Sequence, residues 1–515
     1  MVKPIQSLVI VGGGTAGWLT AGVIAARHKG RIKSGTFSVT LVESPNVPII
    51  GVGEGTWPSL RQTLERIGVS ETELFRQCDA AFKQGAWFAK WTTGAQDDGY
   101  YHPLMLPQGF AHVNLVPHWL QDSRGMTFCD AVCPQGELCD DGLAPKTIAT
   151  PEYQGMANYA YHLDAGKFAP FLQRHCVEKL GVRHVLADVT TVNLDERGDV
   201  AGVSTQQAGD IAGDLFIDCT GFRSLLLGET MGVGFKDCGD ILFCDTALAV
   251  QVPYETPEAA MASHTISTAH EAGWTWDIGL PSRRGVGYVY SSRHATDEQA
   301  EETLARYVGP AYKSLKSRKI KIRSGHRETF WKRNVVAVGL AAGFLEPLES
   351  SAIVLIEMSA RLIAEQTPAN REVMDIIAAR YNDATHYRWG RIIDFLKLHY
   401  VLTQRTDHKF WTDNLDPDTT PERLRNLLQL WKYQPPWFLD EFDRLEEVFP
   451  AASYQYVLYG MGFRTEVGPH DYDSSAGLAN RFRTENQTAT RRMRSQLPKN
   501  RELVNKIREY GLQPV

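Results

Sequence analysis

The sequence lacks a long apolar run, a block of basic residues and a Cys-x-x-Cys pair, and each absence argues against a class of protein. No apolar stretch reaches the roughly 18 residues that a membrane-spanning helix needs, so we expect no membrane partner. Lysine and arginine total 54 against 60 aspartates and glutamates, for a net charge of −6, and they form no cluster. Nucleic-acid binding is therefore not expected.

Cysteines and targeting signals are also scarce. The chain has 8 cysteines in 515 residues, which is typical of a reducing compartment, and it starts on a strand pattern without a basic, apolar leader. We therefore expect a cytoplasmic protein. Cys129, Cys133 and Cys139 are spaced closely enough to suggest a metal site, but no paired histidine or second cysteine pair accompanies them. Unligated cysteines and no metal are the expected outcome.

The clearest positive feature is a glycine pattern that follows the apolar residues 8–11. The pattern and the residues inside it are Gly12, Gly14, Thr15, Ala16 and Gly17. At this Gly-x-Gly-x-x-Gly spacing the first glycine permits a tight turn, the second admits a pyrophosphate and the third lets a helix pack on the strand. Glu43 ends the next predicted strand, residues 37–42, where an acid accepts ribose hydroxyls. These residues predict a dinucleotide site.

A second glycine-rich segment follows soon after Glu43. It comprises Gly51, Val52, Gly53, Glu54, Gly55 and Thr56. Its ordinary interpretation is a strand-to-helix turn, but glycines this close to the ribose acid can also lay backbone amides against a flat cofactor. We favour the second interpretation, a strap across the cofactor.

Apolar periodicity along the rest of the chain predicts an α/β protein of about two or three structural units. It predicts helices over residues 59–67, 71–81, 167–180 and 350–366, and strands over residues 82–91, 184–192, 202–206, 213–219 and 334–338. Residues 91–160 have poor periodicity and predict an elaborated loop region, and residues 233–292 predict a separate sheet. The turn before residue 350, which includes Gly339 and Leu345, places backbone amides at a helix N-terminus, where an anion is stabilised.

Two features of the predicted strands have ordinary explanations. Lys83 lies among apolar residues, and most such lysines extend their ammonium group to the surface. Trp274 and Trp276 lie two residues apart, so they share one face of a strand, where core packing is their usual role.

Several motifs occur in one order along the chain. They are Gly12-x-Gly14-x-x-Gly17, Gly51 to Thr56, Phe82-Lys83, Trp274-x-Trp276-x-Ile278 and Phe344-x-Glu346-Pro347-Leu348-Glu349-Ser350-Ser351. In this order the chain resembles the flavin-dependent halogenases of the tryptophan halogenase type over nearly its whole length. The tryptophan pair is the most diagnostic motif, because related monooxygenases lack it.

The resemblance implies an α/β fold made of six segments. They are FAD-binding segments at residues 1–90 and 161–232, a loop-rich substrate or cover region at 91–160, a β-sheet substrate region at 233–330, an FAD-binding and halide segment at 331–370, and a helical C-terminal region at 371–515. FAD would thus occupy a Rossmann-like domain into which the β-sheet region is inserted.

The resemblance also implies a reaction. In the family, reduced FAD meets O2 to form a flavin hydroperoxide, a halide attacks it, and the hypohalous acid travels to a lysine beside the aromatic substrate. The matching lysine is Lys83, which would orient the electrophile or carry it as a haloamine. Glu349 would hold Lys83 and stabilise the arenium cation, with assistance from Ser350. Trp274 and Trp276 would block direct hydroxylation of the substrate.

Departures from the family pattern bear on the halide and the substrate. The turn that offers amides to chloride or bromide contains Ser351 and Ala352 in place of Thr-Gly, and alanine lacks the positive φ open to glycine, so a changed halide preference is expected. His102 matches a ring-stacking histidine, but Leu104 replaces a ring-stacking phenylalanine. The stretch around Tyr454, residues 453–463, offers no acid for an ammonium group. Indole or a related aromatic is the expected substrate, and free tryptophan a poor one.

Only one complete glycine fingerprint is present, at Gly12 to Gly17, and no second one could seat a nicotinamide cofactor. A separate flavin reductase is therefore expected to supply FADH2. An aromatic hydroxylase on the same scaffold is the alternative if Trp274 and Trp276 only pack. A flavin-binding protein without turnover would require Lys83 and Glu349 to lie far apart. Whether the chain forms a homodimer is left open.

Overall fold

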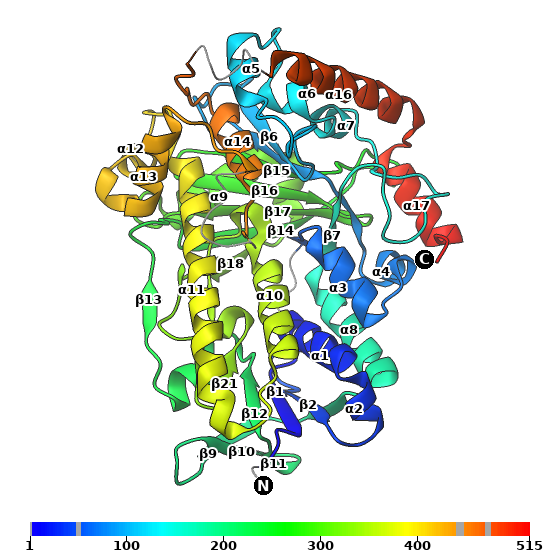
Figure 1. The fold of residues 1–515 in the computed structure, drawn as a ribbon, viewed down its shortest axis with the longest axis vertical. Coiled ribbons are helices and arrows are strands. Elements are labelled where there is room, and N and C mark those ends of the chain that lie inside the picture. The colour runs from blue at the N-terminus through cyan, green and yellow to red at the C-terminus, as the bar shows by residue number, and fades with distance from the viewer. Residues whose placement is uncertain (1–2, 48–52, 439–446, 469–474, 515) are drawn as a thin grey trace.

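The structure is a computed structural model that describes residues 3–47, 53–438, 447–468 and 475–514. A six-stranded sheet occupies the lower part of the molecule in Figure 1. Its strands, in spatial order, are β20 (Trp331–Lys332), β21 (Val335–Ala337), β12 (Leu215–Asp218), β1 (Ser7–Val11), β2 (Ser38–Glu43) and β8 (Arg183–Leu186). All neighbours pair in parallel except β20 and β21. The sheet thus joins distant parts of the chain, as expected for a Rossmann-like domain.

The predicted glycine turn connects β1 to α1 (Thr15–Arg27). Gly12 has a φ of +116°, and a Cβ added there would lie 2.2 Å from the carbonyl oxygen of Cys219. A Cβ on Gly17 would lie 1.9 Å from the carbonyl oxygen of Gly12. Both positions therefore require glycine, and α1 can begin close to the carboxyl ends of β1 and β12. Two further helices, α8 (Ala165–Leu180) and α10 (Ser351–Glu365), pack against α1.

A seven-stranded sheet lies at mid-height in Figure 1. Its strands, in spatial order, are β18 (Arg318–Lys321), β14 (Thr246–Pro253), β17 (Arg283–Tyr290), β16 (Gly273–Gly279), β15 (Thr265–Ala269), β5 (Gly85–Ala89) and β6 (Gly99–Pro103). The sequence predicted a separate sheet over residues 233–292 and loop over 91–160. The observed sheet also includes β5 and β6, and β6 is almost wholly buried, so no polar alternation reveals it in the sequence.

The single strand predicted over residues 82–91 is two strands. β4 (Ala81–Lys83) pairs with β7 (Ala160–Asp164), which also pairs with β3 (Gly53–Gly55), whereas β5 joins the seven-stranded sheet. The helix predicted over residues 71–81 is α4 (Glu71–Gln77), and the chain turns at Asp79 in a left-handed conformation before β4 begins. Lys83, the last residue of β4, therefore lies where the chain passes from the three-stranded sheet of β3, β7 and β4 to the seven-stranded sheet.

Helices cover the sheets and form most of the C-terminal part. The remaining short strands are β9 (Val189–Leu194), β10 (Val200–Thr205), β11 (Gly209–Ala212), β13 (Phe235–Asp237), β19 (Gly325–Arg327) and β22 (Gly343–Phe344). The remaining helices before residue 371 are α2 (Lys29–Lys33), α3 (Ser59–Ile67), α5 (Val116–Gln121), α6 (Phe128–Val132), α7 (Gln135–Asp140) and α9 (Asp297–Val308). The C-terminal helices are α11 (Arg371–Val401), α12 (Lys409–Asn414), α13 (Glu422–Trp431), α14 (Ala451–Gly460), α16 (Ala476–Gln496) and α17 (Asn500–Tyr510). In Figure 1, α11 runs along the long axis and links the regions of both large sheets.

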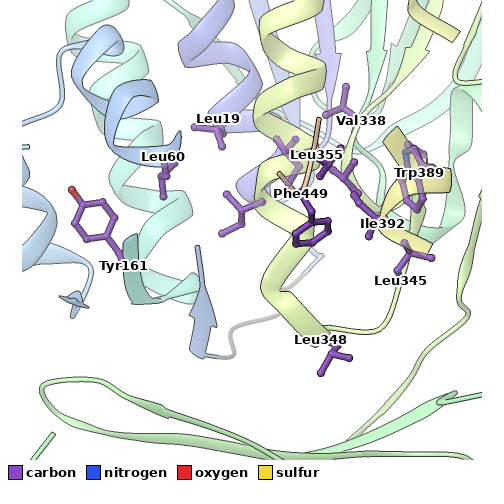
Figure 2. Packing of buried hydrophobic residues seen from close by; sticks show 14 of the residues in the cluster. Leu19, Leu60, Tyr161, Val338, Leu345, Leu348, Leu355, Trp389, Ile392 and Phe449 are labelled. Atoms are coloured by element: carbon purple, nitrogen blue, oxygen red, sulfur yellow. The ribbon is translucent and has the colours of Figure 1, made fainter. Parts of the chain in front are cut away.

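One large hydrophobic cluster joins these layers. Figure 2 shows Leu355 of α10, Ile392 of α11 and Phe449 gathered beside α10. The C-terminal helices are thus packed into the same core as the Rossmann-like sheet. Across the described ranges, no helix combines the length and apolar character that crossing a bilayer requires.

A buried carboxyl group links α10 to α3 and gives a pH-dependent contribution to stability. Glu357 accepts hydrogen bonds from Ser59 at 3.1 Å and Thr63 at 2.5 Å, and burial raises its pKa from 4.5 to about 7. Because the folded pKa exceeds the unfolded one, this contribution is complete below pH 4.5 and is lost as the pH rises through 7. The Glu357→Gln variant stays neutral. It should match the wild type at pH 5 and exceed it at pH 9 by about 3 kcal/mol.

The measurement is the free energy of unfolding in urea at both pH values without cofactor. Glu65→Gln, at an exposed position on α3, is the control and should show no such pH-dependent gain. An equal stability difference between wild type and Glu357→Gln at pH 5 and pH 9 would contradict the assignment.

Candidate active site

A cavity of about 530 Å³ extends from the glycine turn to Lys83. Among the residues predicted for the site, its lining contains Gly12, Gly14, Thr15, Ala16, Glu43, Gly53, Glu54, Gly55, Lys83, Trp274, Trp276, Gly339, Leu345, Glu349, Ser350, Ser351 and Ala352. The lining does not include Gly17, Thr56, His102, Leu104 or Tyr454. Gly51 and Val52 lie outside the described residues. Residues distant in the sequence therefore meet around one cavity.

The end of the cavity at the glycine turn fits a dinucleotide. A Cβ added to Gly14 would meet no heavy atom within 4 Å, so the space over this backbone belongs to the cavity and admits a pyrophosphate. Gly14 directly precedes α1, whose N-terminal amides favour an anion. Glu43 ends β2 on the cavity wall, with one carboxylate oxygen 3.0 Å from His184 Nε2. These positions suit the pyrophosphate and ribose of FAD.

The tryptophan pair on β16 forms part of the cavity wall. Trp274 and Trp276 are 1 % and 8 % exposed, and both line the cavity as well as packing in the core. The ring of Trp276 covers Gly287 on the neighbouring strand β17, where an added Cβ would lie 2.1 Å from the ring. The two tryptophans therefore do both: they pack in the core and they line the cavity.

Lys83 lines the cavity and is buried, with only 3 % of its surface exposed. Its ammonium group donates to the carbonyl oxygen of Thr56 at 3.3 Å and to Ser350 Oγ at 3.1 Å. A Cβ on Gly55 would lie 3.1 Å from Lys83 Nζ and 2.6 Å from Ser350 Oγ. Burial lowers the pKa of Lys83 to about 8, and the Glu349 carboxylate opposes that shift. The interpretation of Lys83 as an exposed surface lysine is wrong.

The turn before α10 has an unusual backbone. Glu349 and Ser350 have φ values of 64° and 57°, in the left-handed region that non-glycine residues seldom adopt. Trp57 Nε1 donates to the carbonyl oxygen of Glu349 at 2.7 Å, which helps to hold the turn. Ala352 lies inside α10, where no positive φ is needed. The expectation that alanine costs backbone freedom there was wrong, because the left-handed residues come earlier.

Two histidines contact the Glu349 carboxylate. His102 Nδ1 lies 2.7 Å and His399 Nε2 lies 3.2 Å from Glu349 Oε1. Burial raises the pKa of Glu349, but the two imidazoles outweigh it and hold that pKa well below its usual range. The sequence predicted a direct contact of Glu349 with Lys83. In the described part of the chain the lysine instead bonds the adjacent Ser350, so both groups are close but separately held.

The other predicted substrate residues, His102, Leu104 and Tyr454, do not line the cavity. His102 uses its second nitrogen on Ser453 Oγ at 2.9 Å. The backbone of Leu104 is held by Gln135 and Asn158. Tyr454 is fully buried and packs against Phe395 and Trp431. Sequence reasoning missed His399, Ser453 and Trp57. Only Trp57 had a local signal, because it directly follows the glycine-rich segment.

The cysteines do not form a metal centre in the described ranges, where no cluster of three or more potential ligands occurs. Cys129, Cys133 and Cys139 are free and buried in or next to α6 and α7. They therefore act as core residues there.

Comparisons with known proteins agree with this geometry. The family model described as "Tryptophan halogenase" matches residues 7–476. The chain is 35 % identical to tryptophan 6-halogenase of Streptomyces toxytricini over 478 residues, or 89 % of both chains. It is 33 % identical to tryptophan 7-halogenase of Lentzea aerocolonigenes over 432 residues, covering 80 % of this chain and 79 % of that one.

A crystal structure of tryptophan halogenase from Shewanella frigidimarina superimposes with a TM-score of 0.96 at 47 % identity, covering 100 % of this chain and 99 % of that one. The match spans the Rossmann-like sheet, the seven-stranded sheet and the C-terminal helices. With its cavity, its buried lysine and these relatives, the chain belongs to the tryptophan halogenase family of flavin-dependent enzymes.

Proposed function

We propose that this chain is a two-component FAD-dependent halogenase that places chloride or bromide on indole or a related electron-rich aromatic compound. The observation that carries the proposal is the position of Lys83. Its buried ammonium group faces the cavity on one side and lies beside the Glu349 turn on the other. An oxidant formed in the cavity would meet this amine before it met any substrate bound beyond it.

The glycine turn and Glu43 would hold the dinucleotide part of FAD, and the wall with Trp274 and Trp276 would face its ring system. Gly53, Glu54 and Gly55 would cover the ring, with Gly339 and Leu345 on the side of α10. Bound and reduced, FAD would react with O2 and a halide to supply hypohalous acid. The N-terminus of α10, at Ser351 and Ala352, suits the halide because its amides lack helical partners.

Lys83 is suited to handle the electrophile in either of two ways. With a pKa of about 8, roughly a tenth of the amine is neutral at pH 7, and the rest is protonated. The protonated form donates a hydrogen bond to hypohalous acid, and the neutral form attacks the halogen to give a haloamine. The Glu349 carboxylate would then stabilise the cationic ring and accept its proton.

A single assay tests the proposal. The purified protein is incubated with a flavin reductase, NADH, FAD, bromide and indole, and the products are analysed for the paired bromine isotopes. Brominated indole that requires both the protein and the reductase is expected. A hydroxylated product would instead indicate the monooxygenase alternative. Rapid NADH oxidation by the protein alone would contradict the two-component arrangement.

Gly14 provides a test of the cofactor site that does not depend on turnover. In Gly14→Ala the new methyl group meets no protein atom but enters the space assigned to the pyrophosphate. We expect FAD affinity to fall about tenfold or more, equivalent to ~1.4 kcal/mol, with an unchanged melting temperature. Flavin fluorescence titration measures the affinity. Gly30→Ala, at an open position on α2, is the matched control, and equal FAD affinity in Gly14→Ala would contradict the site.

The substrate proposed here differs from the one in the names of the curated relatives. Those relatives are named for tryptophan, whose zwitterion needs charged partners when it is buried. On α14, the polar side chains nearest His102 are already engaged. Ser453 bonds His102, Gln455 bonds Asn114 and the carbonyl oxygen of Pro436, and Tyr456 bonds the carbonyl oxygen of Met105.

We therefore expect indole to exceed tryptophan at least about tenfold in kcat/KM, equivalent to ~1.4 kcal/mol, with halogenation at C3, the most nucleophilic carbon. Competition between the two compounds in one reaction measures the ratio. Tryptamine and indole-3-propionate separate the effects of the ammonium and carboxylate groups. A dominant product halogenated on the benzo ring of tryptophan would overturn this expectation.

A further inference from the structure

The inference concerns how the Glu349 carboxylate is held, and it rests on the proposed function of that residue. Both neighbouring imidazoles contact the same oxygen, Oε1, at 2.7 Å from His102 and 3.2 Å from His399. Glu349 also lines the cavity. The second oxygen, Oε2, is thus the carboxylate atom available to the reaction.

The proton positions on His399 follow from its other partner. His399 is fully buried, and its Nδ1 lies 2.6 Å from the hydroxyl of Tyr100. Burial raises the pKa of Tyr100 well above 10 and lowers the pKa of His399, so a neutral phenol faces a neutral imidazole. If Nδ1 carried the proton, the lone pair of Nε2 would face the carboxylate oxygen, which is repulsive. Tyr100 therefore donates to Nδ1, and the proton of His399 is on Nε2. This N–H lies beside Glu349 Oε1, with 3.2 Å between the nitrogen and the oxygen, and attracts its charge without the alignment of a hydrogen bond.

Each histidine forms one arm that links a hydroxyl group to Glu349. The first arm is Tyr100 and His399, and the second is Ser453 and His102. His102 Nδ1 faces Glu349 while Nε2 lies 2.9 Å from Ser453 Oγ, so a hydroxyl again holds the imidazole nitrogen that is turned away from the carboxylate. The two arms come from different elements. Tyr100 and His102 lie on β6, His399 on α11 and Ser453 on α14. The carboxylate is thus fixed by three parts of the fold.

We propose that Tyr100 and His399 are positioning residues that, together with His102, hold Glu349 as an anion with Oε2 directed at the substrate. The arrangement explains how a carboxylate with 6 % of its side chain exposed stays charged without a direct contact to Lys83. The hydrogen bond from His102 and the nearby N–H of His399 act on the same oxygen and supply the stabilisation that burial removes. Loss of either arm leaves burial to raise the Glu349 pKa towards neutrality.

The pH profile of kcat separates this role from a structural one. Besides Tyr100, His102 and His399, Lys83 on β4 interacts electrostatically with Glu349. The groups one step further out are His162 on β7, which faces Lys83, Asp98, which acts on Tyr100, and Tyr456 on α14, whose ring lies beside His102. In the wild type, Glu349 stays ionised throughout the usable pH range. In His399→Leu the remaining activity should rise through a new acid limb between about pH 5 and 7.

The variants are compared in the holoenzyme with indole and bromide. His399→Leu should lower kcat at pH 7 about 10- to 100-fold with less than about a threefold change in KM. His399→Gln retains an N–H donor and should recover most of the activity, and Tyr100→Phe should fall between the two. The control is His118→Leu, which removes a buried histidine of α5 whose Nε2 lies 3.0 Å from Ser475 Oγ, and it should leave the profile unchanged.

A second readout needs no turnover. In protein labelled with ¹⁵N-histidine, the resonances lost in His399→Gln should show a protonated Nε2 and an unprotonated Nδ1, and Tyr100→Phe should mix the two tautomers. An Nδ1–H tautomer in the wild type, or an unchanged pH profile in His399→Leu, would overturn the proposal. A wild type that halogenates nothing refutes the proposed function, and the labelled histidine still decides how the carboxylate is held.

Discussion

Replacing Lys83 with alanine is expected to abolish halogenation while FAD binding persists. Alanine removes the buried amine that would meet the electrophile in this part of the cavity, and neither Thr56 nor Ser350 can replace its chemistry. We expect a loss of at least about 1,000-fold, equivalent to ~4 kcal/mol of barrier. FAD affinity should stay within about twofold, because the hydrogen bonds of Lys83 go to Thr56 and Ser350 and not to the glycine turn or Glu43.

The measurements are product formation with saturating reductase and flavin fluorescence titration. Lys83→Met tests the same chemistry with a side chain that fills the space better, and it should be as inactive as Lys83→Ala. Lys167→Ala, at a half-exposed lysine near Asp79, is the control and should be fully active. Retention of more than about a tenth of the activity in Lys83→Ala would show that the lysine does not handle the halogen.

Replacing Glu349 with glutamine should have the second largest effect. The amide keeps the shape of the side chain but cannot take up the ring proton or offset the positive charge of the arenium intermediate. A fall of about 100-fold in kcat is expected, equivalent to ~2.7 kcal/mol and smaller than for Lys83→Ala, because in the proposed function Lys83 would still deliver the halogen. Glu349 also turns in a left-handed conformation, so glutamine, with a similar side chain, disturbs the backbone least.

Glu346 is a matched control three residues earlier in the same motif. It is fully buried, it accepts a hydrogen bond from Tyr400, and burial raises its pKa to about 7. Glu346→Gln should therefore keep activity within about threefold of the wild type. Equal losses in Glu346→Gln and Glu349→Gln would mean that the motif requires both carboxyls for folding. Glu349 would then have no separate part in the chemistry.

The elements that sequence reasoning predicted well are those with strong local signals. The turn at Gly12 and Gly17 requires glycine for contacts made within a few residues or with the adjacent strand, so the spacing alone reveals it. The helices α3 and α10 follow from apolar periodicity within single segments. Glu43 is predictable because it ends a strand at a fixed distance from the glycine turn.

The failures have one physical cause, which is that distant contacts decide them. The break between β4 and β5 depends on which sheet each strand joins, and nothing near Gln84 encodes that choice. His399 lies within a long helix, 50 residues from Glu349 and 299 from Tyr100, so no spacing rule connects them. The expected contact between Glu349 and Lys83 was replaced by one through Ser350, because the left-handed turn directs the carboxylate towards α11 and β6.

The ring of Trp276 over Gly287 has a consequence for how this enzyme can diverge. Any side chain at residue 287 would enter the volume of the Trp276 ring, so Trp276 can be kept only where residue 287 stays glycine. Substitution of Gly287 while Trp276 is present would displace the Trp276 ring. If Trp276 is first replaced by a smaller residue, residue 287 can then be substituted without this clash. Mutational paths away from the motif are therefore open in one order and closed in the other.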